Sequence, residues 1–434
     1  MSRSTEPHCR IEGTVAPGFE SVRQLYEHKM RTLAEKCTQL CVYYAGEKVV
    51  DLWGSVTDEP GFSPDSLVNV FSSGKSLEAI AIASLVGKGL IRYDARISSY
   101  WPEFAGQGKA ELTVAELMRH EAGLASFSRS MEPDDLLTEN IKQNKVGEFI
   151  EDHAQIFRLG QENRREYHAV TRGWIVNELF RRVDPAGRTI GEFLREDISQ
   201  PLEADAIIGV KREELSRVKK VTPLGFWFQL RQSFIPKFLK REMEHNIFQL
   251  LAKVMRLLPA LRNATVRNAP APFKGMKEIG FFNDPRVVMG ETPSANTNAN
   301  ARGLAKIAAM MAAGGKWAGR EYLTAEAWTE MHADPIEGNM AFVSTCFTQG
   351  GVALFSEASG KIGRSELGLN AGREGFYGWM GLGGSIFQWH PESQIGFGYV
   401  PTSLNILDLV NERGKSYQTE VLRCVARLAS NTKP

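Results

Sequence analysis

The stretch that most constrains the fold runs from Val70 to Ala83, where a polar turn leads directly into an apolar run with helical spacing. It reads VFSSGKSLEAIAIA, so Ser72 and Lys75 stand three residues apart at its start. Residues at i and i+3 of a helix share a face, and both side chains can therefore point into one site. The first turn of a helix also carries unpaired N–H groups and partial positive charge. A serine placed there has a nearby base and nearby donors for a developing oxyanion, as nucleophilic acyl transfer requires.

Length, charge and cysteine content exclude several classes of protein. The 434 residues suffice for one large domain or two modest ones. The 52 Lys+Arg nearly balance 51 Asp+Glu, which gives no electrostatic reason to expect a nucleic acid as partner. Five scattered cysteines favour reduced thiols over a disulfide framework. Because the N-terminus lacks an apolar secretory segment and no apolar run approaches the ~20 residues that span a bilayer, we expect a soluble, cytoplasmic protein.

The spacing of apolar residues predicts the order of the secondary-structure elements. Residues 15–35 have the pattern of an amphipathic helix, and two β-rich runs around a Gly-containing turn, 40–44 and 49–54, predict a hairpin. A helix followed by a hairpin indicates helices packed on an antiparallel sheet. Further helices are expected at 113–118, 140–158, 170–183, 300–313 and 405–429, and further strands at 343–347, 385–389 and 395–400.

Residues 223–262 form an unusual stretch, rich in Phe, Trp and Leu with basic residues interleaved. The basic residues are Arg231, Lys237, Lys240, Arg241, Lys253, Arg256 and Arg262. Three interpretations remain open for this stretch: helices that cap the core, an element that binds a membrane surface or a partner, or a lid over an active site.

The significance of Ser72 depends on further motifs that are spread along most of the chain. S-x-x-K alone is a weak signal, because it recurs at Ser216–Lys219 in a charged segment, and no G-x-S-x-G occurs. The motifs that follow one another in order are Val50–Gly54, Phe71–Lys75, Trp101–Phe104, Leu117–Leu124, Tyr167–Ala169, Pro293–Asn296 and Gly378–Ser385. In these motifs and their order, from about residue 14 to 426, the chain resembles the serine β-lactamase-like family of class C β-lactamases, penicillin-binding proteins and related carboxylesterases.

The resemblance implies a role for each residue of these motifs. Ser72 would be the acylated nucleophile, Lys75 with a lowered pKa would take its proton, and Tyr167 would share the general acid/base work. The oxyanion hole would be the backbone N–H groups of Ser72 and Leu382. Substrate-binding positions would be Trp379, Gly381, Gly383 and His168. Since no metal cluster, phosphate loop or dinucleotide fingerprint is present, we expect no metal and no cofactor.

Two departures from the family pattern bear on the substrate. Ala169 stands where true lactamases have the Asn of Tyr-x-Asn, and Trp379 stands where lactamases and peptidases have Lys or His. A cation at the second position binds the carboxylate of a β-lactam or a peptide terminus, which an indole cannot do. Ester cleavage with an apolar acyl or alkyl group therefore gains support over β-lactam turnover.

We expect an α+β fold of the β-lactamase/DD-peptidase type within a single domain, 1–434. Residues 15–71 and 285–426 would form an antiparallel sheet flanked by helices, and 72–284 an inserted, mostly helical part. The expected function is that of a serine hydrolase, an esterase or acyl-transferase acting on a small-molecule ester. Two alternatives stay open: hydrolysis of an amide, a D-amino-acid peptide or, weakly, a β-lactam, and a catalytically weak scaffold that contacts a membrane surface through 223–262. The oligomeric state is open.

Overall fold

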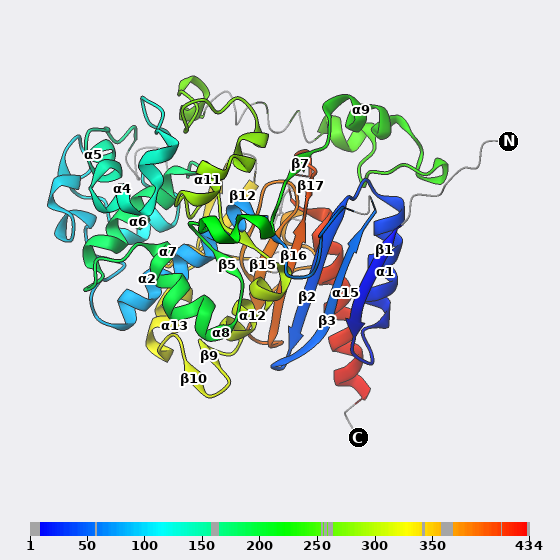
Figure 1. The fold of residues 1–434 in the computed structure, drawn as a ribbon. Helices are drawn as coiled ribbons and strands as arrows, with labels where there is room; N and C mark the ends of the chain where they lie inside the picture. The colour runs from blue at the N-terminus through cyan, green and yellow to red at the C-terminus, as the bar shows by residue number, and fades with distance from the viewer. Residues whose placement is uncertain are drawn as a thin grey trace.

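A nine-stranded antiparallel sheet forms one half of the protein, and a group of helices forms the other (Figure 1). The structure is a computed structural model that describes residues 9–56, 59–157, 165–252, 255, 258, 264–340, 343–356, 368–408 and 410–431. The strands lie in the order β1-β3-β2-β16-β15-β14-β13-β12-β11. Their bounds are β1 Arg10–Val15, β2 Cys37–Tyr44, β3 Glu47–Ser55, β11 Ile336–Met340, β12 Val343–Phe347, β13 Ala353–Leu354, β14 Tyr377–Met380, β15 Ile386–His390 and β16 Ile395–Pro401. Strands from the two ends of the chain thus meet in one sheet, where β2 pairs with β16.

Helices cover both faces of this sheet. On one face lie α1 (Glu20–Thr32) and α15 (Glu412–Asn431), which pack on each other, and on the other face lies α12 (Ala301–Ala312). Side chains along a strand point alternately to the two faces. Accordingly Leu40 and Val42 join the core with α1 and α15, whereas Cys41 between them joins the core with α12. Apolar side chains of the hairpin therefore enter both cores, one on each face of the sheet.

Two glycines in β16 allow α12 to lie unusually close to the sheet. A Cβ atom at Gly396 would lie 2.3 Å from the backbone N of Ala309, and one at Gly398 would lie 2.5 Å from the carbonyl oxygen of Ala301. Any larger side chain at either position would push the helix away from the strand.

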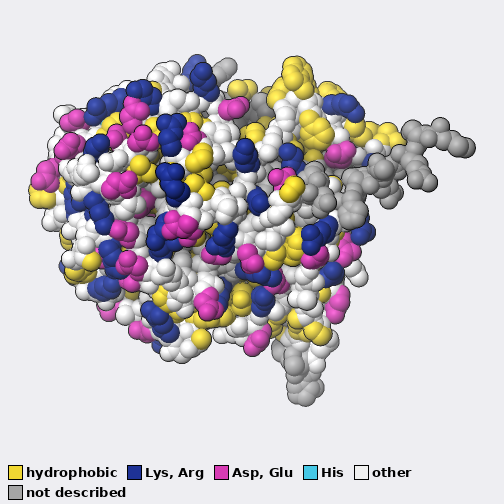
Figure 2. Space-filling view, viewed as in Figure 1, with side chains coloured by type: hydrophobic (Ala, Val, Ile, Leu, Met, Phe, Trp, Pro, Cys, Tyr) yellow, Lys and Arg dark blue, Asp and Glu magenta, His cyan; other side chains and the backbone are white. Residues whose placement is uncertain are grey.

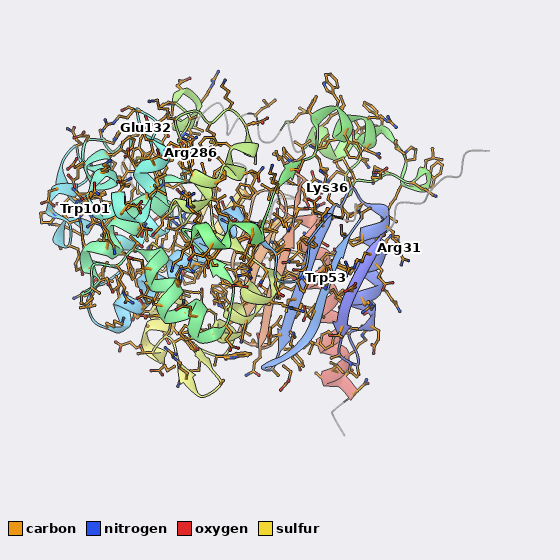
Figure 3. All side chains as sticks on the ribbon, viewed as in Figure 1. Arg31, Lys36, Trp53, Trp101, Glu132 and Arg286 are labelled. Atoms are coloured by element: carbon orange, nitrogen blue, oxygen red, sulfur yellow. The ribbon has the colours of Figure 1, made fainter. Side chains whose placement is uncertain are left out.

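The helical half surrounds α2 (Lys75–Gly87), which follows β4 (Leu67–Asn69) and the short 3₁₀ turn η1 (Phe71–Gly74). Residues 75–85 of α2 are all buried, because α6 (Thr171–Val183) and α13 (Ala325–His332) pack against it. The other helices of this half include α3 Val114–Met118, α4 Thr138–Lys142, α5 Lys145–Glu151 and α7 Ile190–Phe193. Figure 3 labels Trp101, Glu132 and Arg286 in this half, and Arg31, Lys36 and Trp53 in the sheet half.

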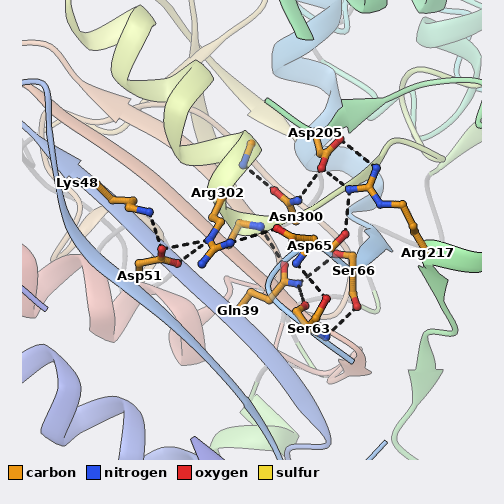
Figure 4. A network of polar contacts seen from close by, with 12 residues as sticks. Gln39, Lys48, Asp51, Ser63, Asp65, Ser66, Asp205, Arg217, Asn300 and Arg302 are labelled. Atoms are coloured by element: carbon orange, nitrogen blue, oxygen red, sulfur yellow. Dashed lines mark hydrogen bonds and ion pairs between the residues drawn. The ribbon is translucent and has the colours of Figure 1, made fainter. Parts of the chain in front are cut away.

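A polar network joins the two halves (Figure 4). Arg302 at the start of α12 contacts Asp51 of β3 at 2.9 Å and Asp65 at 3.1 Å. Asp205 accepts hydrogen bonds from Asn300, at 3.0 Å, and from Arg217. These contacts tie the start of α12 to β3 on one side and to the helical half on the other.

The structure confirms the predicted hairpin, as β2 and β3, and the predicted helix at 300–313, as α12. It also differs from the expectations, and three of the differences are instructive. Residues 10–15 form the edge strand β1, which the sequence pattern did not indicate. The expected helix at 140–158 is interrupted at Asn144, whose φ of 67° is left-handed, into α4 and α5. The last helix begins at Glu412 and not at 405, because the Asp408 carboxylate accepts the N–H groups of Glu412 and Arg413.

In the ranges that the structure describes, no helix combines the length and the apolarity that crossing a bilayer requires.

Candidate active site

Ser72 lies in η1, between the end of β4 and the start of α2. Phe71, the residue before it, has a φ of 47°, a left-handed conformation that is rare for a side chain of this size. Two contacts hold it: its N–H donates to Asn69 Oδ1 at 2.7 Å, and its ring packs edge-on against Phe282. This turn leaves Ser72 half-buried at the head of α2, and within the described residues its N–H makes no backbone hydrogen bond.

Lys75 is buried one turn after Ser72, and its amine has three neighbours. Nζ lies 3.2 Å from Ser72 Oγ, and it donates to the carbonyl oxygens of Ala169 at 2.7 Å and Ser294 at 2.9 Å. Burial holds the pKa of Lys75 well below its usual value; Glu78 opposes this shift and Arg172 adds to it. If the amine is neutral, two of its N–H groups can serve the two carbonyls while its lone pair turns to Ser72. Lys75 can therefore accept the serine proton.

An ion pair buried beneath Lys75 fixes this arrangement. Glu78 and Arg172 are fully buried and contact each other at 2.8 Å. Glu78 also accepts a hydrogen bond from Ser294 Oγ at 2.5 Å, and Arg172 donates to the carbonyl oxygen of Lys75 at 3.1 Å. The pair thus holds both the backbone of Lys75 and one of the residues that Nζ binds. The sequence motifs included Ser294 but did not single out Glu78 or Arg172.

Tyr167 lies across from Lys75, with its ring 4.9 Å from Nζ. Its hydroxyl accepts a hydrogen bond from Trp379 Nε1 at 2.9 Å. Burial raises the pKa of Tyr167 to about 12, although hydrogen bonds with Ser72 and Trp379 oppose the shift. The hydroxyl is therefore protonated near neutral pH and can donate a proton, whereas the lowered pKa of Lys75 favours that residue as the base.

The loop after β14 is pressed against the segment that carries Ser72. A Cβ atom at Gly381 would lie 2.1 Å from the carbonyl oxygen of Val70. Ser385 Oγ donates to that same oxygen at 2.7 Å and lies 3.0 Å from Ser73 Oγ. Leu382, next to Gly381, is half-buried, and within the described residues its N–H has no hydrogen-bond partner. The loop therefore presents a donor beside Ser72, as an oxyanion hole requires.

A largely apolar pocket of about 250 Å³ opens beside Ser72. It is lined by Ser72, Tyr167, Met340, Val343, Leu369, Trp379, Met380, Gly381, Leu382, Gly383, Ile406, Asp408, Val410 and Asn411. Among these described lining residues none is a lysine, arginine or histidine. Asp408 is the one charged residue of the set, and both of its carboxylate oxygens accept N–H groups from the start of α15. The pocket therefore suits a neutral, apolar group.

The structure brings all but one of the expected site residues together. Ser72, Tyr167, Trp379, Gly381, Leu382 and Gly383 line the pocket, and Lys75 contacts Ser72. His168 does not reach the pocket. Its side chain is fully buried, with Nε2 accepting the Leu124 N–H at 3.0 Å and Nδ1 donating to the Glu166 carbonyl at 2.6 Å. Burial lowers the pKa of His168 to about 3, so it is a neutral residue that orders the segment around Tyr167.

Sequence reasoning missed the segment 405–411, which it assigned to a helix. Here Ile406, Asp408 and Val410 line the pocket, and the Asn411 amide donates to the carbonyl oxygens of Gly381, at 3.1 Å, and Ser385, at 2.9 Å. The Asp–x–x–Asn spacing just before a polar helix start was the signal available in the sequence.

One cluster of the described residues has side chains of metal-ligating type: His245, Asp408 and Glu412, whose ligand atoms lie within 4.8 Å of one another. Asp408 already serves the start of α15, and His245 Nε2 contacts Glu412 at 2.5 Å. These contacts give the three side chains a structural role.

Comparison with known proteins agrees with this geometry. The chain is 27% identical over 401 residues to the protein named esterase/beta-lactamase LipL of Mycobacterium tuberculosis, which covers 91% of this chain and 83% of LipL. Among solved structures it is similar to a family VIII carboxylesterase, with a TM-score of 0.74 and 26% identity over 96% of this chain and 100% of that one. A penicillin-binding protein homologue from Caulobacter crescentus gives a TM-score of 0.71 and 25% identity, with the same coverage.

These likenesses confirm the α+β fold and the resemblance expected from the sequence. The Beta-lactamase family model matches residues 22–411, which include every residue of the site described above. The chain therefore belongs to the Beta-lactamase family.

Proposed function

We propose that the protein is a serine esterase that cleaves small or lipophilic carboxylic esters through a Ser72 acyl-enzyme. The observation that carries the proposal is the apolar pocket beside Ser72, in which Trp379 occupies the position where a substrate carboxylate would need a cation. The indole N–H is already engaged by the Tyr167 hydroxyl, so Trp379 offers the pocket an apolar ring. A neutral acyl or alkyl group fits such a pocket better than a charged one.

Acylation begins with proton transfer from Ser72 Oγ to the neutral Lys75 amine. Oγ attacks the ester carbonyl carbon, and the electron pair of the C=O bond moves onto oxygen, which accepts the N–H groups of Ser72 and Leu382. When the tetrahedral intermediate collapses, the bond to the alkoxy oxygen breaks. A proton from the Lys75–Tyr167 pair completes the departing alcohol, and the acyl group stays on Ser72.

Deacylation repeats these steps with water as the nucleophile. The Lys75–Tyr167 pair accepts a water proton while the water oxygen attacks the acyl carbon. When the intermediate collapses, the bond from the acyl carbon to Ser72 Oγ breaks, the pair returns its proton to Oγ, and a carboxylic acid leaves. The Ala169 carbonyl matters here, because it binds Lys75 where a lactamase would use the amide of the Tyr-x-Asn motif. The departure at Ala169 therefore leaves the lysine anchored.

Substrates with a carboxylate beside the scissile bond fit this pocket less well. β-Lactams and peptide termini carry such a group, and its binding needs a charged hydrogen-bond donor. The described lining residues include no side-chain cation, and Asp408 contributes negative charge to the wall. These features favour neutral esters over β-lactams and over D-amino-acid peptides.

The test is hydrolysis of a p-nitrophenyl ester series, with mapping of a fluorophosphonate adduct. Ser72→Ala should lower kcat by about 10⁴-fold or more and abolish labelling, because the nucleophile is lost. Ser76→Ala is the matched control: Ser76 is buried on the same helix and its hydroxyl has no hydrogen-bond partner among the described residues, so activity should remain. An adduct on another residue, or a Ser72→Ala protein as active as wild type, would refute the proposal.

A further inference from the structure

The helix α9 (Phe226–Phe234) has its polarity reversed relative to an ordinary surface helix. Phe226, Trp227 and Phe234 are 62%, 77% and 64% exposed. Gln229, Gln232 and Ser233 are 3%, 5% and 2% exposed. A surface helix normally buries its apolar stripe and exposes its polar one. The outer face of α9 therefore suits an apolar environment.

Hydrogen bonds fix this orientation of α9. Gln229 Nε2 donates to the carbonyl oxygen of Leu224 at 2.7 Å, and Gln232 Oε1 accepts the N–H of Glu242 at 3.1 Å. Rotation of the helix to bury its aromatic side chains would break both bonds and leave polar atoms to be satisfied elsewhere. The exposed aromatic face is thus built into the local structure.

The apolar face continues beyond α9 across the same stretch. Phe238 is 82% exposed, and a following helix that includes 247–252, 255 and 258 exposes Phe248, Leu251, Met255 and Leu258. These last four residues lie at i, i+3, i+7 and i+10, which is one helical stripe. In Figure 2 the apolar side chains gather at the top of the molecule, where Figure 1 places α9. Lys253, Val254, Arg256, Leu257 and 259–262 lie outside the described residues.

Positive charge accompanies the apolar face. The segment 223–262 contains seven lysines and arginines against two acidic residues, Glu242 and Glu244. Arg231, Lys237 and Lys240 are exposed, whereas Glu244 forms an ion pair with Lys29 of α1 at 2.5 Å. Exposed aromatic rings beside basic side chains are the composition that binds an anionic lipid interface, where the rings enter the headgroup region and the cations attract phosphates.

The stretch is attached at two points to the segment that lines the pocket. Before α9, β7 (Thr222–Pro223) pairs with β17 (Ser403–Leu404), and Leu224 N–H donates to the Leu404 carbonyl at 2.9 Å. After α9, the buried His245 contacts Glu412 at 2.5 Å. The pocket-lining residues of 406–411 lie in the chain between these two attachment points. If α9 binds a surface, these two attachments therefore keep the pocket close to that surface.

We propose that residues 223–258 dock the protein on an anionic lipid bilayer, from which the adjoining pocket takes a lipophilic ester. The proposal of docking rests on the reversed polarity of α9 and on the basic residues around it. The identity of the substrate as a membrane-borne ester rests in addition on the esterase function proposed above. Docking raises the local concentration of such a substrate at the pocket without any change in the chemistry at Ser72.

The test is co-sedimentation of the full-length protein with vesicles of phosphatidylcholine, alone or with phosphatidylglycerol. Wild type should bind the anionic vesicles and lose binding as salt is raised, because exposed charges are screened. The triple variant W227S/F238S/F248S should bind at least about tenfold more weakly. The double variant I156S/I336S is the matched control, because Ile156 and Ile336 are exposed apolar side chains outside this stretch.

Three results would overturn the docking: no binding of wild type to anionic vesicles, equal loss of binding in the control variant, or a wild-type dimer that the triple variant dissociates without any vesicle binding. The last would assign the face to a second copy of the chain. Hydrolysis separates the two proposals. The triple variant should keep wild-type turnover of soluble p-nitrophenyl acetate and lose about tenfold on a p-nitrophenyl ester of a long-chain acid embedded in the vesicles. Vesicle binding without hydrolysis of either ester would refute the esterase function and leave the docking intact.

Discussion

The two walls of the active site differ in how they are built. The wall from the helical half carries Ser72 and Lys75, and it rests on the fully buried pair of Glu78 and Arg172. The opposite wall, from β14 and the segment after β17, supplies Trp379, backbone groups and aliphatic side chains. One wall is a network in which every contact depends on the next, and the other is mainly packed surface. Substitutions on the second wall can therefore change which substrate fits while the contacts of Ser72 and Lys75 on the first wall stay the same.

The largest effect should come from removing Lys75, the proposed base, from the wall that the helical half supplies, which we call the polar wall. Lys75→Met keeps the length and burial of the side chain but takes away the proton acceptor, so kcat/KM should fall by about 10²- to 10⁴-fold. Lys88→Met, directly after the end of the same helix, is the control and should leave steady-state turnover of a p-nitrophenyl ester unchanged. A Lys75→Met enzyme that retains wild-type kcat/KM would show that another group takes the Ser72 proton.

Loss of one partner of the buried pair should destabilise the whole polar wall. Glu78→Gln leaves Arg172 buried and uncompensated, which should lower the free energy of unfolding by about 3–5 kcal/mol. Urea denaturation followed by tryptophan fluorescence measures this change. The double variant E78Q/R172M removes both charges and should recover much of the loss. If E78Q alone were as stable as wild type, the pair would not support the site.

The pH dependence of kcat/KM should report the protonation of Lys75 on the polar wall. Below the pKa of Lys75 the amine is protonated and cannot accept the Ser72 proton, so kcat/KM for a neutral ester should fall about tenfold per pH unit there. Above that pKa the rate should reach a plateau. Because the pKa of Tyr167 is about 12, its hydroxyl stays protonated through the neutral and mildly alkaline range. A pH-stat assay on a neutral alkyl ester measures the profile, and a rate that rises as the pH falls would contradict it.

The smallest effect should come from the opposite wall, which we call the packed wall. A substitution there should change which esters the protein prefers. Trp379→Lys places a cation in the pocket, which should lower kcat/KM for long-chain neutral esters by about tenfold. The same variant should raise the relative rate on esters whose acyl group carries a carboxylate. Trp379→Phe is the matched control, since it loses the N–H bond to Tyr167 but keeps an aromatic ring. Equal selectivity in the two variants would mean that charge at this position does not govern preference.

The residues to which we assign the chemistry were predictable because they lie in local patterns. Ser72 and Lys75 are brought together by one turn of helix, which the spacing alone indicates. Trp379, Gly381 and Leu382 followed from the family motif, and the structure places all three at the pocket. The buried partners Glu78 and Arg172 were not predictable, because their contact joins α2 to α6 and depends on tertiary packing.

Two other failures have identifiable causes. His168 follows Tyr167 in sequence, but the backbone takes up both of its ring nitrogens, as buried polar atoms require. For 223–258, helical spacing revealed apolar stripes but could not say which side of them faced the protein. The polar spacing of Gln229, Gln232 and Ser233 marked the buried face, and only the structure shows these side chains turned inward.

The pairing of β2 with β16 has a consequence for synthesis of the protein on the ribosome. The last strand of the sheet to be translated, β16, lies between β2 and β15, and the segment that completes the pocket follows it. Until residues 395–401 have emerged, the hairpin of β2 and β3 has an open edge of unpaired backbone groups, which invites pairing with other chains. A nascent chain therefore carries Ser72 long before the pocket beside it is complete, and a chain interrupted before residue 395 should aggregate before that pocket can form.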